Sequence, residues 1–385
     1  MKRKLLGLAA IGLVLALGFW VWGKNTGGSG ENSLEITGRD YGILVYLDGK
    51  LLSYADLEQD ETTVRLVKTD AETGAETEMG TMPAVGMAYD DGDVFAGKYY
   101  QCFSNGGVVG SGDESRMVGV LYEFDPKQSV AVPVADTRKE DIGPTMWLCA
   151  VSNGILQLKA PRVDSGEHAY FDLYCPDTGK NETVLTGSDV DEFCQSAMDQ
   201  NLLYVLTSHY NDPNRSSMFS LQVFETEAYR MVSEINLDAL ESMLREARVG
   251  DMVVCGDYVY FSNWNNHSVI AKISDGVATP VLERELPMLR CAEWFNRPEQ
   301  TKQMLFYEQL EENPECVVLN ADTGELRSFR PKLRKGYELH AIQIDGERLM
   351  VYSAKESLFT GKDYYKFLDF YDFDDFIRQD DSDGD

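Results

Sequence analysis

The sequence predicts an all-β fold built from a repeated four-stranded unit. Its clearest copy runs from Met146 to Gly187, where four short strands alternate with three turns. Asn153-Gly154 predicts the first hairpin, because both central residues of a type I′ turn need positive φ. Pro176 to Lys180 predicts the second, because Asp and Gly favour such turns. The 20 Tyr and 17 Phe also favour strands. A sheet of four strands cannot bury both faces alone, so the copies are expected to stack as blades of a propeller.

Six further copies follow the same plan. The second has Asp90 to Asp93 as its first turn, and the fourth is followed by a short amphipathic helix, Asp238 to Ala247, whose first residues have capping-box spacing. The seventh ends in a weak strand, Asp374 to Gln379, and Ser33 to Gly38 is expected to supply a strand that closes the ring. The copies cover residues 42–81, 86–135, 146–187, 193–237, 251–283, 289–331 and 338–379. Roughly 48 residues per copy predicts a seven-bladed β-propeller, with six or eight blades as alternatives.

The N-terminus predicts the compartment. Lys2, Arg3 and Lys4 precede the uncharged segment Leu5 to Gly23, which as a transmembrane helix would span roughly 28 Å. The basic cluster favours a cytoplasmic start, and hence an uncleaved anchor in the cell membrane with the bulk of the chain extracytoplasmic. A signal sequence cleaved after Gly18, giving a secreted protein, is the alternative. The expected organisation is an anchor or signal over residues 1–23, a flexible linker over 24–33, the propeller over 34–379 and an acidic tail over 380–385.

Charge and motif content exclude several functions. Lys and Arg number 35 against 64 Asp and Glu, and the formal net charge of −29 would repel a nucleic-acid backbone. The sequence has no phosphate-cradling loop, no zincin motif and no nucleophile elbow, so no catalytic residue, metal site or cofactor is predicted. The seven cysteines are widely spaced and form no Cys-x-x-Cys pair; buried thiols are expected, and disulfides are the alternative.

The turn between third and fourth strands recurs in three copies. It stands in LVKTDAETGAETEM (Leu66 to Met79), LYCPDTGKNETVL (Leu173 to Leu185) and VVLNADTGELRSF (Val317 to Phe329). These stretches resemble the PQQ-like and YVTN-like repeats, and more broadly the WD40-like repeats, of bacterial extracytoplasmic propellers. The resemblance implies a propeller over nearly the whole exported region, and it carries over no catalytic residues.

Uneven loop lengths predict a binding face. Turns between first and second strands are short, whereas the connections at 105–117, 209–217 and 355–363 exceed what a hairpin needs, and loops on a rigid scaffold often carry binding residues. All connections between second and third strands lie on one face of a propeller, and three of the four histidines are in or beside them. The expected binding residues are Arg116, His168, His209, Tyr210, Arg215, Trp264 and His267.

The expected function is a membrane-anchored, extracytoplasmic binding module for a protein, glycan or peptide. Trp264 offers a ring for stacking, and Arg116 or Arg215 offers a bidentate contact to an anionic group. The alternative is an extracytoplasmic hydrolase or lyase acting on a glycan or peptide, which needs two or three ionisable groups converging at a pocket. A structural spacer in an envelope complex is a third alternative, in which the long loops share no pocket.

Overall fold

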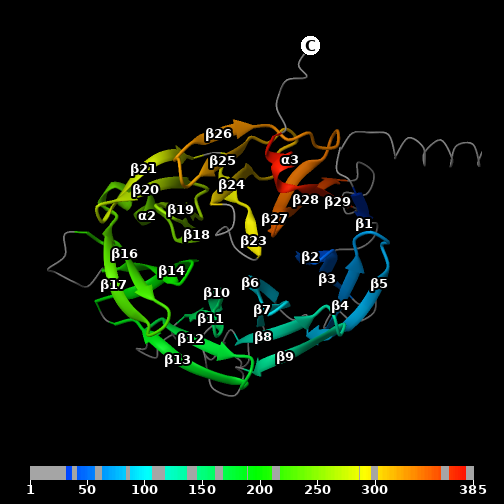
Figure 1. Ribbon diagram of the computed structural model, residues 1–385, viewed down its shortest axis with the longest axis horizontal. Coiled ribbons are helices and arrows are strands. Elements are labelled where there is room, and N and C mark those ends of the chain that lie inside the picture. The colour runs from blue at the N-terminus through cyan, green and yellow to red at the C-terminus, as the bar shows by residue number, and fades with distance from the viewer. Residues whose placement is uncertain are drawn as a thin grey trace, which may run out of the picture.

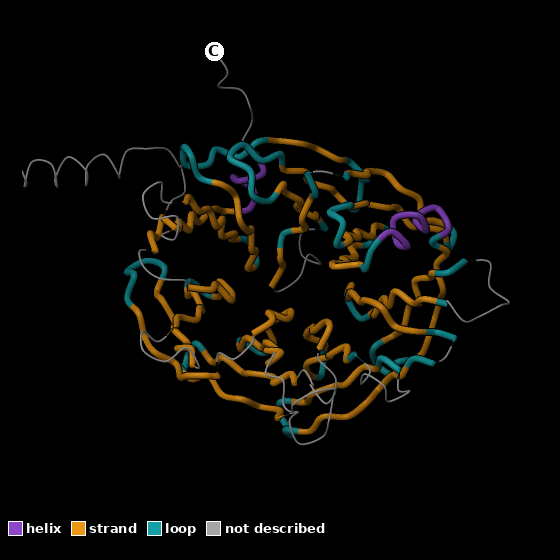
Figure 2. The backbone as a smooth tube through the Cα atoms, turned by 180° about the vertical axis from the view of Figure 1, so that it is seen from behind, coloured by secondary structure: helices purple, strands orange, loops and turns teal. Residues whose placement is uncertain are grey.

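The fold comes from a computed structural model, in which the strands form a ring of sheets (Figure 1), seen from behind in Figure 2. The structure describes residues 32–36, 41–56, 63–83, 87–105, 118–136, 145–160, 168–188, 190–209, 217–285, 287–295, 302–356 and 364–378. Within these ranges the fold is an all-β propeller with three short helical segments.

Four sheets have four antiparallel strands each. The first contains β2 (Tyr41–Leu47), β3 (Lys50–Asp56), β4 (Thr63–Asp70) and β5 (Glu76–Pro83). The second contains β6 (Met87–Phe95), β7 (Lys98–Asn105), β8 (Val118–Asp125) and β9 (Val130–Asp136). The third contains β10 (Thr145–Val151), β11 (Gly154–Lys159), β12 (Tyr170–Cys175) and β13 (Lys180–Thr186). The fourth contains β22 (Leu289–Cys291), β24 (Gln303–Glu308), β25 (Cys316–Asn320) and β26 (Leu326–Phe329).

A fifth sheet brings the two ends of the chain together. Its order is β1-β29-β28-β27-β23. The N-terminal strand pairs with β29 in antiparallel register, Leu34 opposite Leu368, which confirms that the segment around Ser33 to Gly38 closes the ring. The strands are β1 (Asn32–Ile36), β23 (Glu293–Phe295), β27 (Glu338–Asp345), β28 (Arg348–Glu356) and β29 (Tyr364–Asp372).

The sixth sheet has eight strands, in the order β14-β15-β16-β17-β21-β20-β19-β18. Its two antiparallel halves are joined where β17 and β21 run parallel and Asn236 pairs with Val277. One half contains β14 (Glu192–Asp199), β15 (Leu202–Ser208), β16 (Phe219–Glu225) and β17 (Arg230–Asn236), and the other contains β18 (Val249–Cys255), β19 (Tyr258–Asn263), β20 (Ser268–Ser274) and β21 (Val277–Arg284).

The prediction of seven separate blades is therefore wrong. The described strands form five separate blades and one eight-stranded sheet. The two halves of that sheet pair at the end of β17, after which the chain folds into the 3-10 helix η2 (Asp238–Leu240) and the helix α2 (Glu241–Glu246). The Asn236 N–H donates to the Gly276 carbonyl at 2.8 Å, so the end of β17 is held against the start of β21. The repeat length in the sequence predicts the number of four-stranded units, but it does not show whether strands of neighbouring units pair with each other.

The predicted transmembrane segment, Leu5 to Gly23, lies outside the described residues, as do the linker up to Glu31 and the acidic tail. Among the helices that the structure describes, none is both long and apolar enough to cross a membrane.

Two local predictions are also corrected. Asp90 to Asp93 does not form a turn: β6 continues through it with a bulge between Tyr89 and Gly92, and the chain reverses at Ala96-Gly97, where both residues have positive φ. The predicted strand from Asp374 to Gln379 is instead the helix α3 (Phe373–Ile377). It buries Phe373, Phe376 and Ile377, while β1 takes the outer strand position.

The core lies between neighbouring sheets. A chain of aromatic rings passes from the third sheet into the eight-stranded sheet: Trp147 and Phe171 have centroids 6.3 Å apart, Phe171 and Phe193 5.6 Å, and Phe193 and Phe224 6.5 Å. Such tilted and edge-on contacts are favourable beyond the area that they bury. The contact between Phe171 and Phe193 thus packs the third sheet against the eight-stranded sheet.

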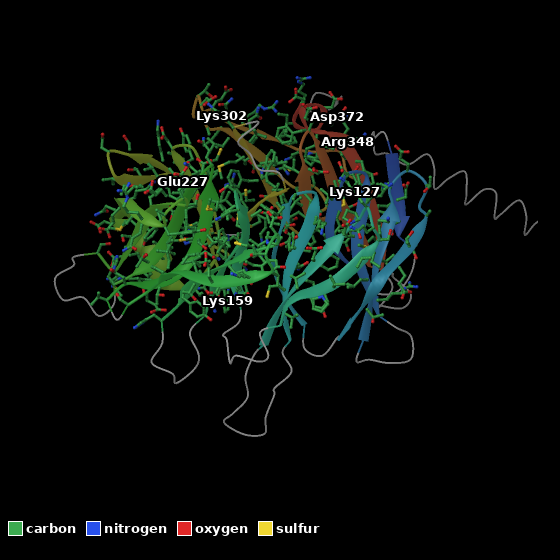
Figure 3. All side chains as sticks on the ribbon, turned by 60° about the horizontal axis from the view of Figure 1, so that its bottom comes forward. Lys127, Lys159, Glu227, Lys302, Arg348 and Asp372 are labelled. Carbon is green, nitrogen blue, oxygen red and sulfur yellow. The ribbon has the colours of Figure 1, made fainter. Side chains whose placement is uncertain are left out.

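Strand direction gives the ring two faces. In each antiparallel unit the turns from first to second and from third to fourth strands end on one face, here called the short-turn face. The connections from second to third strands, and from each fourth strand to the next unit, end on the other, here called the histidine face. In Figure 3, Glu227 and Arg348 of the short-turn face lie higher in the view than Lys159, which stands at the end of β11.

Candidate functional site

The histidine face gathers the three histidines singled out by the sequence. His168 precedes β12, His209 follows β15 and His267 precedes β20, so three successive four-stranded units each contribute one. Trp264 stands in the same turn as His267. Arg116, Tyr210 and Arg215 lie outside the described residues, and their proposed binding roles stay predictions.

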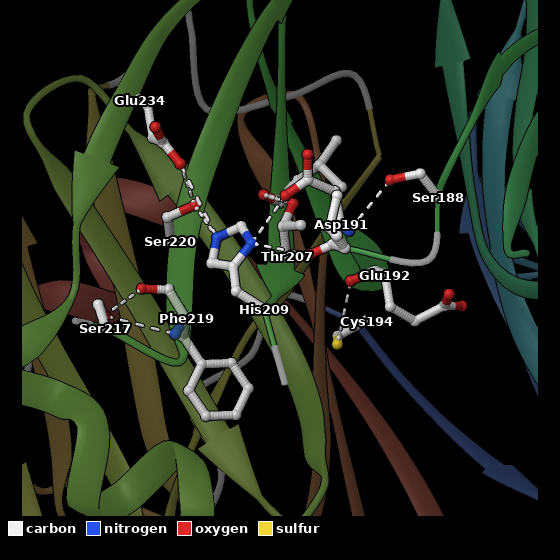
Figure 4. Close-up of polar contacts among 12 residues, drawn as sticks. Ser188, Asp191, Glu192, Cys194, Thr207, His209, Ser217, Phe219, Ser220 and Glu234 are labelled. Atoms are coloured by element: carbon white, nitrogen blue, oxygen red, sulfur yellow. Dashed lines mark hydrogen bonds and ion pairs between the residues drawn. The ribbon is translucent and has the colours of Figure 1, made fainter. Parts of the chain in front are cut away.

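His209 is the centre of a buried polar network (Figure 4). Its side chain is 0% exposed, and its Nδ1 lies 2.8 Å from Oδ1 of Asp191 in the connection between β13 and β14. Its Nε2 lies 2.8 Å from the hydroxyl of Ser220 on β16. That hydroxyl lies 2.7 Å from Oε1 of Glu234 on β17. Side chains from four segments are thus joined through one imidazole ring.

The same connection also reaches His168. The Nδ1 of His168 lies 3.3 Å from Oε2 of Glu192, and the other carboxylate oxygen accepts the backbone N–H of Ala169 at 3.2 Å. Because Asp191 and Glu192 are adjacent in sequence, one short connection holds a histidine on each side. It ties the third sheet to the eight-stranded sheet.

His267 is held between two carboxylates. Its Nδ1 lies 3.1 Å from Oε2 of Glu246 at the end of α2, and its Nε2 lies 2.9 Å from Oε1 of Glu283 on β21. The hydrogen bond from His267 is the main reason that the pKa of Glu246 is lowered, and Asn263 and Asn265 add to it. The His267 side chain therefore links α2 to β21, the strand that joins the half-sheet of β18 to β21 to the other half.

Trp264 presents its indole ring to solvent in a fixed position. The residue is 67% exposed, yet its backbone N–H donates to the Arg248 carbonyl at 3.0 Å. The Arg248 guanidinium lies 5.1 Å from the ring centroid, within cation–π range. In the same turn Oδ1 of Asn263 accepts the backbone N–H groups of Asn265 and His267 at 3.0 and 3.1 Å. The turn is thereby fixed without burying the ring.

Two further apolar side chains are exposed on this face. Leu310, in the connection between β24 and β25, is 56% exposed, and Val190, beside Asp191, is 43% exposed. They lie on units that flank Trp264 on either side in chain order. Exposed apolar side chains set among charged ones are typical of protein interaction sites.

The contacts around His209 resemble those of a catalytic triad, but the serine hydroxyl is buried. Asp191, His209 and Ser220 contact one another in the order carboxylate, imidazole, hydroxyl. Ser220 is however only 4% exposed, and its hydroxyl also bonds to the carboxylate of Glu234. This arrangement offers no nucleophile at the surface. Within the described ranges no group of three or more potential ligands is placed to hold a metal ion.

Sequence reasoning found the histidines and missed their partners. The acidic partners are Asp191, Glu192, Glu234, Glu246 and Glu283. Glu234 lies opposite Gln222 in the β16–β17 register, and this places it diagonally beside Ser220. Only that register, which the sequence does not show, identifies the pair. The adjacent acids Asp191 and Glu192, standing just before a predicted strand, are the one signal that was available.

Solved structures similar to this chain share little sequence with it. Sqt1 of Saccharomyces cerevisiae is 8% identical over 88% of each chain, with a TM-score of 0.47. The Dos1 propeller is 11% identical over 85% of this chain and 78% of its own, with a TM-score of 0.49. BamB from Moraxella catarrhalis is 11% identical over 88% of this chain and 97% of its own, with a TM-score of 0.44. No protein-family model matches the chain, and no curated protein matches it in sequence. The propeller fold is therefore assigned from the strand pairing of the chain itself.

Proposed function

We propose that this protein is a binding module that engages a protein partner through its histidine face, with Trp264 at the centre of the contact. The observation that carries the proposal is the exposed and fixed indole ring. Tryptophan is enriched among residues that dominate binding energy, and a ring held in place before binding loses little conformational entropy. A partner that covered this ring would remove its apolar surface from water, which would contribute to binding.

The charge of the face indicates the chemistry of the partner. Glu246 and Glu283 flank His267 next to Trp264, and Asp191, Glu192 and Glu234 lie along the same face. The whole chain has a formal net charge of −29. A partner with basic side chains around an apolar centre would complement this surface, and its association would slow as salt is added.

A paired substitution tests the proposal. The purified chain, its Trp264→Ala variant and its Met231→Ala variant would each be immobilised and exposed to the same envelope extract, and bound proteins compared by mass spectrometry. Met231 is 51% exposed but lies on the outer strand β17, away from the proposed contact. We expect a protein retained by the wild type and by Met231→Ala but weakened at least tenfold by Trp264→Ala, since a central aromatic contributes about 2 kcal/mol or more. Equal retention by all three would show that the indole does not contact the partner.

A further inference from the structure

We propose that Lys335 and Lys355, here called the lysine pair, form a binding site for the carboxylates of an acidic peptide segment. Lys335 stands in the connection from β26 to β27, and Lys355 stands near the end of β28. Both positions lie on the histidine face, where fourth strands lead to the next unit and second strands end. Trp264 belongs to a different connection, between β19 and β20, so the lysine pair is a second site and does not depend on a contact at Trp264.

The connection that carries Lys335 is basic, although the chain as a whole is acidic. Residues 326–337 (LRSFRPKLRKGY) contain five Lys and Arg and no Asp or Glu, whereas the whole chain has 64 Asp and Glu against 35 Lys and Arg. Each of the three arginines donates to an acceptor within the protein: Arg327 to the Ile377 carbonyl, Arg330 to the Asn313 carbonyl, and Arg334 to the Asp369 carboxylate. Lys335, in contrast, is exposed to solvent.

A stack of side chains fixes the turn from Arg334 to Tyr337. The Tyr337 N–H donates to the Arg334 carbonyl at 3.0 Å, and Gly336 has a φ of 75°, which glycine adopts without strain. The Arg334 guanidinium lies 4.1 Å from the ring centroid of Phe367, and this ring meets the Tyr337 ring edge-on at 5.3 Å. Lys335 therefore stands at the tip of a turn whose two ends are held by packing.

Lys355 reaches the same turn from β28. Its Nζ lies 5.9 Å from the ring centroid of Tyr337, and a Cβ atom on Gly336 would lie 3.0 Å from that nitrogen. The ammonium group thus lies over the residue that follows Lys335. Within the described ranges neither lysine forms an ion pair with a carboxylate. Two like charges held side by side repel each other, and a bound anion would replace this repulsion by charge-assisted hydrogen bonds.

The surroundings of the lysine pair favour a peptide carboxylate as the anion. Phosphate groups are often bound by arginine forks or by helix N-termini, but the nearby arginines are bonded within the protein and no helix begins in residues 330–337. Leu310, which is 56% exposed, lies next to this connection, because its N–H donates to the Leu339 carbonyl at 2.7 Å. A peptide with glutamates on either side of an apolar residue would contact both the lysine pair and Leu310.

A labelled peptide with three glutamates on each side of a leucine serves as the probe, and the same peptide with glutamines is its control. We expect the full chain at low salt to bind the acidic probe and not the control, as measured by fluorescence anisotropy. Lys335→Gln/Lys355→Gln should bind the probe about fivefold or more weakly, because two surface ion pairs are lost. Lys127→Gln/Lys302→Gln, which removes the same charge from the short-turn face (Figure 3), should bind it as the wild type does.

Protection from acetylation locates the contact on the wild type. The bound probe should slow the acetylation of Lys335 and Lys355, but not that of Lys127, as read by mass spectrometry. Gly336→Ala keeps both charges of the lysine pair, but its Cβ would displace the Lys355 ammonium, so its affinity for the probe should also fall. Trp264→Ala should bind the probe with unchanged affinity, which separates this result from the contact proposed at Trp264.

Three results would overturn the proposal. The first is unchanged affinity of Lys335→Gln/Lys355→Gln for the probe. The second is an equal loss of affinity in the two double variants, which would show a general charge effect. The third is displacement of the probe by inorganic phosphate at an equal concentration, which would assign the lysine pair to a phosphate ligand.

Discussion

Individual charged residues in the interior are stabilised by partners from other elements. Arg334 contacts the Asp369 carboxylate with Nη2 at 3.0 Å and with Nε at 3.3 Å, and their side chains are 12% and 5% exposed. The guanidinium also lies 4.1 Å from the ring centroid of Phe367. Lys159, which is 1% exposed, donates to the Thr145 hydroxyl at 2.6 Å. At this scale the fold depends on polar pairs that are removed from water.

We expect Arg334→Leu to lower the free energy of unfolding by about 3–5 kcal/mol, because it leaves the buried Asp369 carboxylate without its counter-charge. Urea unfolding at pH 7 measures the loss. Arg378→Leu is the matched control, since Arg378 pairs with Asp374 at 3.0 Å but is 67% exposed, and exposed pairs contribute less than about 1 kcal/mol. Similar losses of unfolding free energy in the two variants would show that the Arg334–Asp369 pair contributes no more to stability than an exposed pair.

The sequence pattern predicts where the secondary-structure elements lie, but contacts with neighbouring residues decide where each element begins and ends. The predicted helix at Asp238 to Ala247 is present as η2 and α2, but the capping box is not formed. Instead Oδ1 of Asn236 accepts the Asp238 N–H at 2.8 Å, and the Asn236 amide donates to the Asp238 carboxylate at 3.0 Å. The residue that ends β17 therefore also begins the helical segment. This short transition holds α2 close to His267.

Because β1 closes the ring, we expect its removal to destabilise the fold. Removing residues 1–36 should lower the free energy of unfolding by about 2.5–7.5 kcal/mol, since five residue pairs are lost, taken as one hydrogen bond each at about 0.5–1.5 kcal/mol per hydrogen bond. It should also promote aggregation, because β29 becomes an unpaired edge. Urea unfolding and light scattering would measure the two effects. Removing only residues 1–31, which keeps β1, is the control; equal stability of both truncated chains would exclude a closing role for β1.

The whole molecule is an acidic ring with two unlike faces. The short-turn face consists of tight turns such as Asp48-Gly49 and Asp275-Gly276, with positive φ at each residue. The histidine face carries the exposed Trp264 and the histidine–carboxylate contacts. The seven cysteines, distributed over four of the six sheets, are free thiols.

The location of this ring stays a prediction from Lys2 to Lys4 and the apolar run after them. We propose that the propeller functions outside the cytoplasm. Alkaline phosphatase, which is active only after export, would be fused after Arg378 of the full chain and of a chain lacking residues 2–23. We expect activity in the first fusion and none in the second, because the basic start and the apolar run direct export. Activity of a cytoplasmic reporter at the same position, without phosphatase activity, would contradict the proposal.

Local signals in the sequence predict the strands, most of their turns and the face on which the histidines lie. Asn153-Gly154, for example, predicts a hairpin, and β10 and β11 do form one, but Val151 lies opposite Gly154, so that the turn residues are Ser152 and Asn153 and the register is shifted by one residue from the prediction. The tertiary structure alone decided that β17 pairs with β21 and that Glu234 stands beside Ser220, which bonds His209. Such contacts depend on the register between strands and on the stacking of one sheet against the next. Neither leaves a periodic mark in the sequence, because each is set by the packing of many side chains at once.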